Sequence, residues 1–315
     1  RQFVLQRQEK EQFVRFMRLY EGFCGVRVMT YCIMTNHIHI LLEVPPKPTT
    51  ELSDSALLDK LVMVYSESYV EQVAGLLAAA RNAGAMEEVA RIRTKYLYRM
   101  YDLSEFMKVL KQRFTQWYNR KHGRKGTLWE GRYKCVLVQD GYASRVMAAY
   151  IDLNPVRAGM VSDPKDYRWC GYAEAAAGKR KAKAGIARVL EKNEESTGLA
   201  AERLSQKARL EQYRMLLFED AEVDASASNK KGVDARAVKR VLAAGGKLSR
   251  AQMLHCRVRY FTAGAVVGSR QYVDGYYQRK RAQFSSRRRS GARKMKYMAD
   301  GGLYALRDLR RRPVG

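Results

Sequence analysis

The stretch GVRVMTYCIMTNHIHILLEVP, residues 25–45, decides the predicted fold. β-Branched and aromatic residues dominate 25–34 and return over 37–44, so each of these segments is predicted to be a strand. The dipeptide Thr-Asn at 35–36 forms a short turn between them, and a proline-rich segment from Pro45 onward ends the second strand. The stretch therefore predicts a β-hairpin.

Two of the four histidines of the chain, His37 and His39, lie on the second predicted strand. Residues i and i+2 of a strand project from the same face, so the two imidazoles should lie side by side, with Ile38, Ile40 and Leu42 facing the core. Such a pair can hold a divalent metal if a third ligand comes from another element. Taken alone, the pattern also fits two histidines that merely line a half-exposed sheet.

Apolar periodicity predicts mostly helices around this hairpin. In chain order, the further expected elements are a helix over 8–22, a wholly helical segment over 51–100, a helix over 104–121, a strand over 127–140 and a helix over 142–154. Ser104 is expected to cap the helix that begins there, and Pro155 to stop the last one.

The composition changes after about residue 175. Over 175–232, AAAGKRKAKAG and VDASASNKKG look like flexible basic linkers around one charged helix. Beyond 233, three helical stretches are expected: DARAVKRVLAA, SRAQMLHCRVRYF and GSRQYVDGYYQRKR. The last two look like the helix-turn-helix unit at the end of the replication initiator DnaA, with Ser269, Arg270 and Gln271 at the start of a recognition helix. A plain basic helical appendage is the alternative.

Charge is the strongest compositional signal. The chain has 59 Lys+Arg against 32 Asp+Glu, a formal net charge of +27 and a pI near 10.0. Such a field attracts a polyanion, and nucleic acid is the commonest one in a cell, with a ribosome or an anionic membrane surface as alternatives. Between 279 and 312 the sequence has thirteen basic residues and two acidic ones, which suits phosphate contacts.

Two further features bear on location. No run approaches the roughly 18 consecutive apolar residues of a membrane span, and the start has no signal-peptide pattern. The five cysteines form no CxxC pair, which favours a reducing compartment. We therefore expect a cytoplasmic, nucleoid-associated protein without a membrane partner.

The segment AAYIDLNPVRAGMV, residues 148–161, contains a second set of candidate residues. Tyr150 and Asn154 are four apart on a predicted helix and hence on one face, so a phenol hydroxyl and an amide oxygen would point the same way. If that face meets the histidines, one site holds a metal, an oxygen ligand and a nucleophile. The alternative is that Tyr150 is a core aromatic and Asn154 caps the break before the proline.

Three blocks in order now carry a resemblance: TYCIMTNHIHILLEVP, GTLWEGRYK, and YIDLNPVRAGMV followed by YRWCGY. Together they resemble the REP-associated tyrosine transposases, relatives of the IS200/IS605 transposases in the single-tyrosine HUH superfamily. The resemblance covers about residues 3–45 and 102–173. It implies an α+β, RRM-like (ferredoxin-like) HUH domain, with a central antiparallel sheet flanked by helices.

The resemblance also implies residue roles. His37 and His39 match the HUH histidines, Tyr150 matches the nucleophile, and Asn154 matches the position of the third ligand to a Mg²⁺ or Mn²⁺ ion. The implied activity is a metal-dependent endonuclease and strand transferase on single-stranded DNA, acting at hairpins of palindromic repeats through a 5′-phosphotyrosine.

Further residues are expected to bind DNA. Trp129 and Tyr133 would stack on bases while Arg132 and Lys134 meet phosphates, unless they simply form a sheet strand with one aromatic face. The other candidates lie on the helix over 104–121, which is otherwise a solvated basic face, and in the C-terminal region: Arg113, Arg120, Lys121, Arg270, Arg287, Arg288 and Arg289.

These interpretations give a domain plan and two rival functions. The expected domains are an HUH domain over 1–45 and 101–175, a helical insertion over 46–100, a charged linker with a helix over 176–232, and a basic helical DNA-binding region over 233–315. The strand that usually precedes the first helix of the family is expected to be missing here. The rivals are a non-catalytic, domesticated DNA-hairpin or repeat-binding protein and an HUH replication initiator or relaxase; the sequence has no Walker-type phosphate loop.

Overall fold

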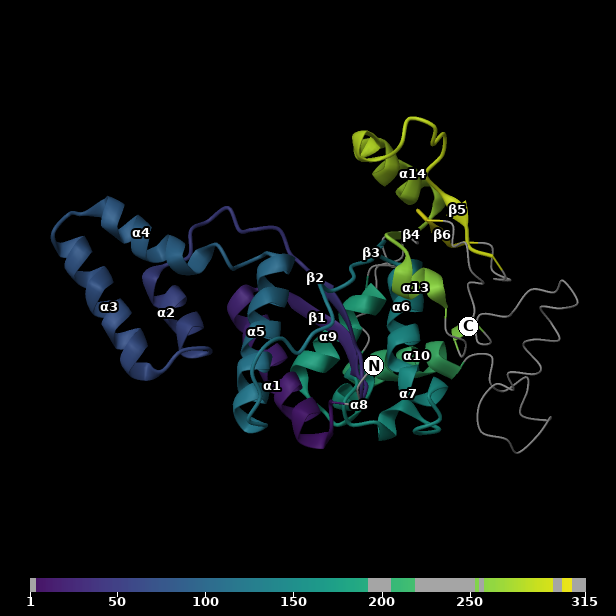
Figure 1. The fold of residues 1–315 in the computed structure, drawn as a ribbon, viewed down its shortest axis with the longest axis horizontal. Helices are drawn as coiled ribbons and strands as arrows, with labels where there is room; N and C mark the ends of the chain where they lie inside the picture. Colours follow the sequence, from purple (N-terminus) through teal and green to yellow (C-terminus); the bar gives the residue numbers. More distant parts are fainter. Residues whose placement is uncertain (1–3, 192–204, 219–252, 255–257, 297–301, 308–315) are drawn as a thin grey trace, which may run out of the picture. The chain divides into compact units, whose positions relative to one another are not determined.

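The structure, a computed structural model, describes residues 4–191, 205–218, 253–254, 258–296 and 302–307. It combines helices with two small sheets, as the α+β prediction requires (Figure 1). Contacts divide the chain into two compact units, one formed by 1–28 and 42–132 and the other by 29–41 and 133–315. Each unit is described by itself.

Helices make up the first unit. The predicted helix over 8–22 is α1 (Arg7–Cys24), which packs on α5 (Leu103–Lys121). The predicted helical segment over 51–100 contains α2 (Asp54–Val62), α3 (Glu67–Asn82) and α4 (Met86–Leu97), which lie side by side (Figure 1). These predictions are confirmed.

The cap of α5 differs from the prediction. Asp102, not Ser104, precedes the helix, and its carboxylate accepts a hydrogen bond from the Glu105 N–H at 2.8 Å. Ser104 is already inside the first turn, where its backbone is helical and its hydroxyl cannot take the capping position. The charged cap also complements the positive end of the helix dipole.

The predicted hairpin is confirmed. Strands β1 (Arg27–Ile33) and β2 (Ile38–Glu43) form a two-stranded sheet, and the Met34 N–H donates to the His37 carbonyl at 2.9 Å across the turn. β1 is buried along its whole length after Arg27. Within the described ranges, the expected central sheet consists of this hairpin, extended by one isolated antiparallel bridge between Cys32 and Cys170.

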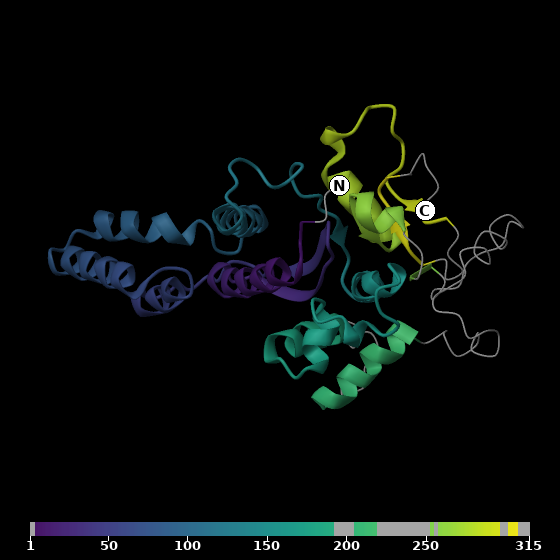
Figure 2. The same ribbon diagram turned by 60° about the horizontal axis from the view of Figure 1, so that its bottom comes forward.

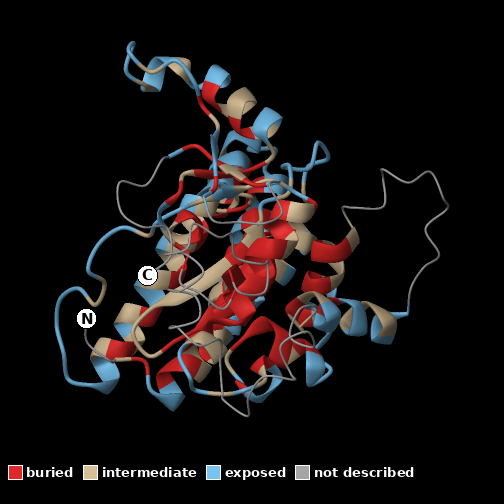
Figure 3. Ribbon diagram, turned by 90° about the vertical axis from the view of Figure 1, so that its right-hand side faces the viewer, coloured by how far each residue is buried: buried red, intermediate tan, exposed pale blue. Residues whose placement is uncertain are grey.

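The second unit contains the helix with the candidate nucleophile. α6 (Tyr142–Asp152) is buried from Ala143 to its end except at the half-buried Arg145, and it is followed by the single-turn α7 (Asn154–Arg157). Buried residues are drawn in red in Figure 3. The next elements are η1 (Pro164–Asp166), α8 (Gly171–Ala176), α9 (Arg180–Glu191) and α10 (Gln206–Phe218), and α10 lies beside α9 (Figure 2).

The first expected linker, AAAGKRKAKAG, is not a linker. Its residues belong to the end of α8 and the start of α9, because Ala182, Ile186 and Val189 lie on one face of α9 and are buried in the main core of the second unit. The other expected linker, VDASASNKKG, lies outside the described residues.

The strand expected over 127–140 is also wrong for most of its length. Only Leu137–Val138 forms a strand, β3, which pairs in parallel with β4 (Val266–Gly268) rather than with the hairpin. The chain bends at 129–132, and the Trp129 indole turns back to the Thr115 hydroxyl at 2.9 Å. The alternating pattern alone did not reveal either break.

The C-terminal region is not the expected helix-turn-helix. α13 (Arg259–Ala263) and α14 (Arg270–Arg279) are separated by β4, which also pairs with β6 (Tyr304–Ala305), the partner of β5 (Arg293–Lys294). α14 does begin as predicted, with Ser269 as its cap. The stretch DARAVKRVLAA and much of SRAQMLHCRVRYF lie outside the described residues. None of the helices in the described ranges is long and apolar enough to cross a membrane.

Candidate active site

The histidine pair lies where the hairpin begins its second strand. The ring centroids of His37 and His39 are 5.1 Å apart and the rings meet at 78°, so the predicted side-by-side placement is confirmed. His37 Nδ1 lies 2.7 Å from the Asn36 amide oxygen. With the proton on Nδ1, this hydrogen bond fixes the ring and leaves Nε2 unprotonated, which is the state that a metal ligand needs.

The buried face of β2 differs from the expected one. Ile38, Ile40 and Leu42 are only half-buried, whereas Leu41 is the fully buried residue of the strand, at 7% exposure. Because side chains alternate along a strand, Leu41 shares its face with the two histidines. Leu41 belongs to the same hydrophobic core as Tyr150. The histidine face of β2 is therefore the face that continues into the core around α6.

Tyr150 is in the last turn of α6 and only 2% exposed. The Phe261 ring, from α13, meets it edge-on with centroids 4.9 Å apart. The Arg157 guanidinium lies over the Tyr150 ring at 3.9 Å from its centroid. These contacts agree with the alternative interpretation of Tyr150 as a core aromatic, and they cover the side chain that would have to reach a phosphate.

Asn154 lies one turn beyond Tyr150, where the chain passes from α6 into α7. Its amide nitrogen donates to the carbonyls of Tyr150 and Ile151, at 3.4 and 3.1 Å. Tyr150 and Asn154 are thus brought together, as predicted, and the side chain also has the structural role given as the alternative. Because the amide nitrogen is committed to the helix end, the oxygen is the atom left to bind a cation.

Arg157 ties this helix end to a distant part of the chain. One nitrogen of its guanidinium donates to the Tyr150 carbonyl at 2.7 Å, and another to the Leu254 carbonyl at 2.6 Å. The turn that carries Tyr150 is therefore held from two sides, by its own continuation into α7 and by residues about a hundred positions later.

Asp152 is a residue that sequence reasoning missed. It is fully buried, and its carboxylate accepts hydrogen bonds from the Thr30 hydroxyl at 2.8 and 2.9 Å, the Tyr213 hydroxyl at 2.6 Å and the Tyr172 N–H at 3.1 Å. Burial raises the pKa of Asp152 to about 6, although these donors act in the opposite direction. Its signal in the sequence was a lone aspartate in an apolar helix, two residues after Tyr150.

Trp129 is engaged in packing rather than exposed as a platform. Its indole N–H donates to the Thr115 hydroxyl, and its ring lies against Phe13 and Phe114, with centroids 6.3 and 5.9 Å apart. Lys111 covers the ring at 5.2 Å. Since Trp129 is only half-buried, base stacking by this ring stays a prediction.

The basic residues predicted on α5 differ in their environments. Lys121 forms an ion pair of 2.6 Å with the buried Glu9, which His122 also contacts at 3.2 Å. Burial opposes the charge of Glu9, but the hydrogen bonds from Lys121 and His122 outweigh burial and lower its pKa. Arg113 lies over the Phe16 ring at 5.9 Å. Lys121 is thus partly committed to a structural pair.

The remaining candidates are mostly exposed. Only Tyr133 and Arg288 among them are half-buried, and the others present their side chains to solvent: Arg120, Arg132, Lys134, Arg270, Arg287 and Arg289. Exposed cations can reach phosphates without a change in the fold.

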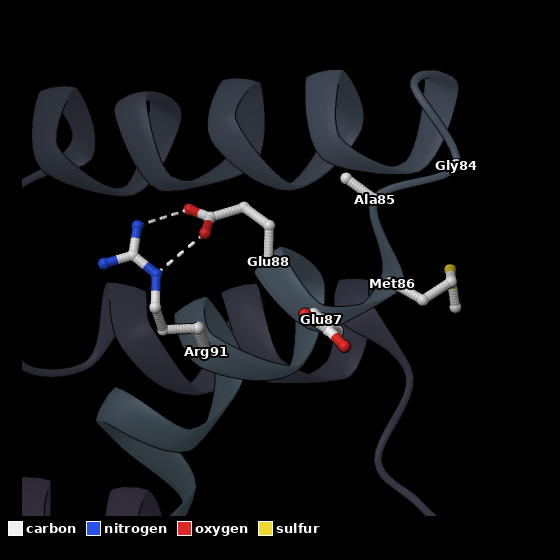
Figure 4. A pocket seen from close by; sticks show the side chains of 6 residues that line it. All are labelled: Gly84, Ala85, Met86, Glu87, Glu88 and Arg91. Atoms are coloured by element: carbon white, nitrogen blue, oxygen red, sulfur yellow. Dashed lines mark hydrogen bonds and ion pairs between the residues drawn. The ribbon is translucent and has the colours of Figure 1, made fainter.

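Neither a cluster of acidic, cysteine and histidine side chains nor a surface hollow adds a candidate site in the described residues. Among the described residues, no group of three or more His, Cys, Asp or Glu side chains is placed to hold a metal, and the His₂Asn set is of a different composition. The shallow hollow in Figure 4 lies at the turn between α3 and α4 and is lined by Gly84, Ala85, Met86, Glu87, Glu88 and Arg91. Its Glu88 carboxylate is held by the Arg91 guanidinium at 2.6 and 2.7 Å (Figure 4).

Comparison of the chain with protein-family models, with curated proteins and with solved structures gave no match. These comparisons therefore do not identify a family.

Proposed function

We propose that the chain is a divalent-metal-dependent DNA endonuclease and strand transferase, a transposase that acts on single-stranded DNA at hairpins with Tyr150 as its nucleophile. One observation carries the proposal: the histidine pair lies on the face of β2 that continues into the core containing Tyr150, and Asn154 is one turn from that tyrosine. We further propose that β1, β2 and α6 correspond to the centre of an RRM-like HUH domain. DNA as partner implies association with the nucleoid.

The donor set fits a divalent cation. His37 and His39 offer two imidazole nitrogens, and Asn154 offers an amide oxygen whose amide group is oriented by its bonds to the helix end. The amide carbonyl is a ligand type that Mg²⁺ and Mn²⁺ prefer, and the imidazoles add nitrogen ligands that later first-row metals prefer. When bound, the cation would draw charge from a nonbridging phosphate oxygen and so offset the charge that grows in the transition state.

The covalent step belongs to Tyr150. Its phenol oxygen would form a bond to the phosphorus while the bond from phosphorus to the 3′-oxygen breaks. The phenol proton ends on the released 3′-hydroxyl, and the 5′-phosphate remains on the tyrosine. Because a phosphodiester replaces a phosphodiester, the released hydroxyl can reverse the reaction, so strands are cut and rejoined without ATP.

The burial of Tyr150 adds a requirement for local opening. A side chain that is 2% exposed beneath Phe261 and Arg157 has to be uncovered before its hydroxyl meets a phosphate. We expect Phe261→Ala to raise the rate of covalent attachment roughly three- to tenfold, since an aromatic pair contributes about 0.5–1.5 kcal/mol to the closed state. Single-turnover formation of the adduct measures this rate.

Phe218→Ala is the matched control for that variant. It removes the same ring from the end of α10, where Phe218 is half-buried under the Arg214 guanidinium at 4.7 Å and is not among the residues proposed to bind DNA. Its rate of attachment should equal that of the wild type. A slower Phe261→Ala variant would mean that Phe261 holds the tyrosine in its productive position, which contradicts the opening requirement.

The decisive test of the function is cleavage of labelled single-stranded hairpin oligonucleotides with Mn²⁺. The wild type should give a covalent protein–DNA band that disappears with chelator, and Tyr150→Phe should give none. Tyr142→Phe changes a tyrosine at the other end of α6 and should retain the band. A band that persists in Tyr150→Phe would assign the nucleophile elsewhere.

A second candidate function has its own support. The covered ring of Tyr150 and the helix-capping bonds of Asn154 are what a non-catalytic DNA-hairpin-binding protein would retain from such a site. Tight hairpin binding without a covalent band in wild type and variants would favour this binder over the enzyme.

A further inference from the structure

The C-terminal region forms a small lobe of its own, named here the basic lobe and defined as residues 265–296 and 302–307. Its strands β4, β6 and β5 belong to a sheet of order β3-β4-β6-β5, whose first strand comes from outside the lobe, and α14 packs on β4 and β6. Its core consists of Val266, Val273, Tyr277 and Leu306. The lobe is therefore a folded unit and not a flexible basic tail over the residues that are described.

Two arginines of the lobe stabilise the loop between α14 and β5 through hydrogen bonds to backbone carbonyls. The Arg281 guanidinium donates to the carbonyls of Phe284 and Ser285, at 3.2 and 3.1 Å. The Arg288 guanidinium donates to the carbonyls of Ser290 and Gly291, at 3.0 and 3.1 Å, and also to that of Leu306. Such bonds fix the course of the loop, because backbone carbonyls without partners would otherwise have to be solvated.

Both of these arginines lie over the ring of Tyr277. The guanidinium carbons of Arg281 and Arg288 are each 5.5 Å from its ring centroid, and the Tyr277 hydroxyl donates to the Arg288 carbonyl. The run Arg-Arg-Arg at 287–289 is thus divided. Its middle member faces inward onto aromatic rings, and its two neighbours are exposed.

The cations that are not used in this way are exposed. The described lobe has one acidic residue, the half-buried Asp274, whose carboxylate accepts from the Ala292 N–H at 2.7 Å. Over the full range 265–307 the sequence has eleven lysines and arginines against two aspartates. The exposed members are Arg270, Arg279, Lys280, Arg287, Arg289, Arg293, Lys294, Lys296 and Arg307. Such an excess attracts polyanions.

The aromatic residues of the lobe indicate which nucleic acid it fits. Tyr272, Tyr276, Tyr277, Phe284 and Tyr304 pack in or against its core, and none of them is among the exposed large apolar side chains of the described residues. Single strands are bound largely by stacking of bases on exposed rings, whereas paired strands offer mainly phosphates. We infer that the basic lobe binds the sugar-phosphate backbone of a paired DNA stem through Arg287, Arg289 and the neighbouring exposed cations.

This inference rests on the proposed function for the identity of the polymer, and the lobe is connected to that function by the chain. β3 pairs with β4 and is followed directly by α6, the helix of Tyr150. The Ser269 N–H, at the start of α14, donates to the Gln139 side-chain oxygen at 2.6 Å. A stem held by the lobe would therefore be held by an element joined to the tyrosine helix.

The test compares two double variants of the full chain in binding to a labelled DNA hairpin at several salt concentrations. Arg287→Gln with Arg289→Gln should weaken binding and reduce the slope of log K against log salt by about two, because two phosphate contacts are lost. Lys179→Gln with Arg180→Gln removes the same charge from exposed residues at the start of α9 and should leave the slope unchanged.

Three results would overturn the inference. Equal losses of affinity in the two double variants would mean that net charge alone accounts for the effect. An unchanged salt slope in the Arg287 and Arg289 variant would mean that these residues do not contact phosphates. A loss as large for an unpaired oligonucleotide of the same length would exclude the paired stem as the partner. A stem with a different sequence should bind equally, since phosphates carry no sequence information.

The same proteins separate this inference from the proposed function. Covalent attachment is measured in parallel with Mn²⁺. Salt-dependent stem binding without any adduct in the wild type would contradict the proposed chemistry and leave the basic lobe as assigned. An adduct in the wild type, together with unchanged stem binding in the Arg287 and Arg289 variant, would support the proposed chemistry and contradict the role given to the basic lobe.

Discussion

Replacing Asp152 by alanine is expected to lower the free energy of unfolding of the second unit by about 3–5 kcal/mol. The change removes a buried acceptor from the Thr30 hydroxyl, the Tyr213 hydroxyl and the Tyr172 N–H at once. Each of these donors would then be buried without its partner, at a cost of about 1–3 kcal/mol per group. The loss should also detach α10, whose Tyr213 contacts this carboxylate.

Urea denaturation measures the total loss, and hydrogen exchange of the peptide over 142–157 measures the local opening of α6 and α7. Asp166→Ala is the matched control, because Asp166 is an exposed aspartate of the same unit. Its effect should stay within about 0.5 kcal/mol. An Asp152→Ala protein as stable as this control would contradict the role given to the buried carboxylate.

Asp152 also gives the expected stability a pH dependence. Its pKa is raised in the folded state, from 3.8 to about 6, so between these values the folded protein binds more protons at this residue than the unfolded chain does. Stability from this group is therefore present below about pH 4 and is lost as the pH rises through 6. Relative to Asp152→Asn, the wild type should lose on the order of 2–3 kcal/mol between pH 4 and pH 7.

Replacing both His37 and His39 by alanine is expected to reduce metal-dependent covalent attachment by about a thousandfold or more. The reason is that two of the three proposed ligands are lost together, and with them the stabilisation of charge on the phosphate, which contributes several kcal/mol to such reactions. Hairpin binding should remain, because the residues proposed to contact the stem lie in the basic lobe.

Mn²⁺ binding provides a readout of this variant that does not depend on activity. Titration followed by electron paramagnetic resonance should show one bound ion in the wild type and none at the same concentration in the double variant. His122→Ala removes a histidine that contacts Glu9 at 3.2 Å, and it should retain both the ion and the adduct. Unchanged attachment in the His37 and His39 variant would exclude the pair as metal ligands.

Local patterns were sufficient for the hairpin and for the helices of the first unit. The two strands are adjacent in the chain, so their pairing needs only the alternation and the turn at 35–36. α1 ends at Gly25 because a left-handed residue, with φ of 70°, can close its last turn. In both cases the residues that determine the structure are within a few positions of one another.

Long-range contacts account for what the sequence did not reveal. The hydrogen bond between Asp152 and Tyr213 spans 61 positions, and no pattern in either segment points to the other. The basic and small residues at the start of α9 predict a linker because they conceal an apolar stripe at Ala182, Ile186 and Val189. The strand β4 has only three residues, and it exists because β3 and β6 pair with it.

The candidate site was predicted in its parts rather than as a whole. The spacing placed His37 beside His39 and Tyr150 near Asn154, and the structure confirms both pairs. The spacing did not predict that Phe261 would cover the tyrosine, because that contact is made by a segment more than a hundred residues later in the chain. Joining the two pairs at one metal stays a prediction of the proposed function.

The parallel pairing of β3 with β4 has a consequence for how this protein can change over evolutionary time. Leu137 and Val138 have Val266 and Val267 as their partners, so a short strand from the middle of the gene is completed by one encoded near its end. Loss of the later segment would leave the strand before α6 with unpaired backbone groups and Tyr150 without Phe261. We therefore expect the two segments to be inherited together rather than exchanged as independent cassettes.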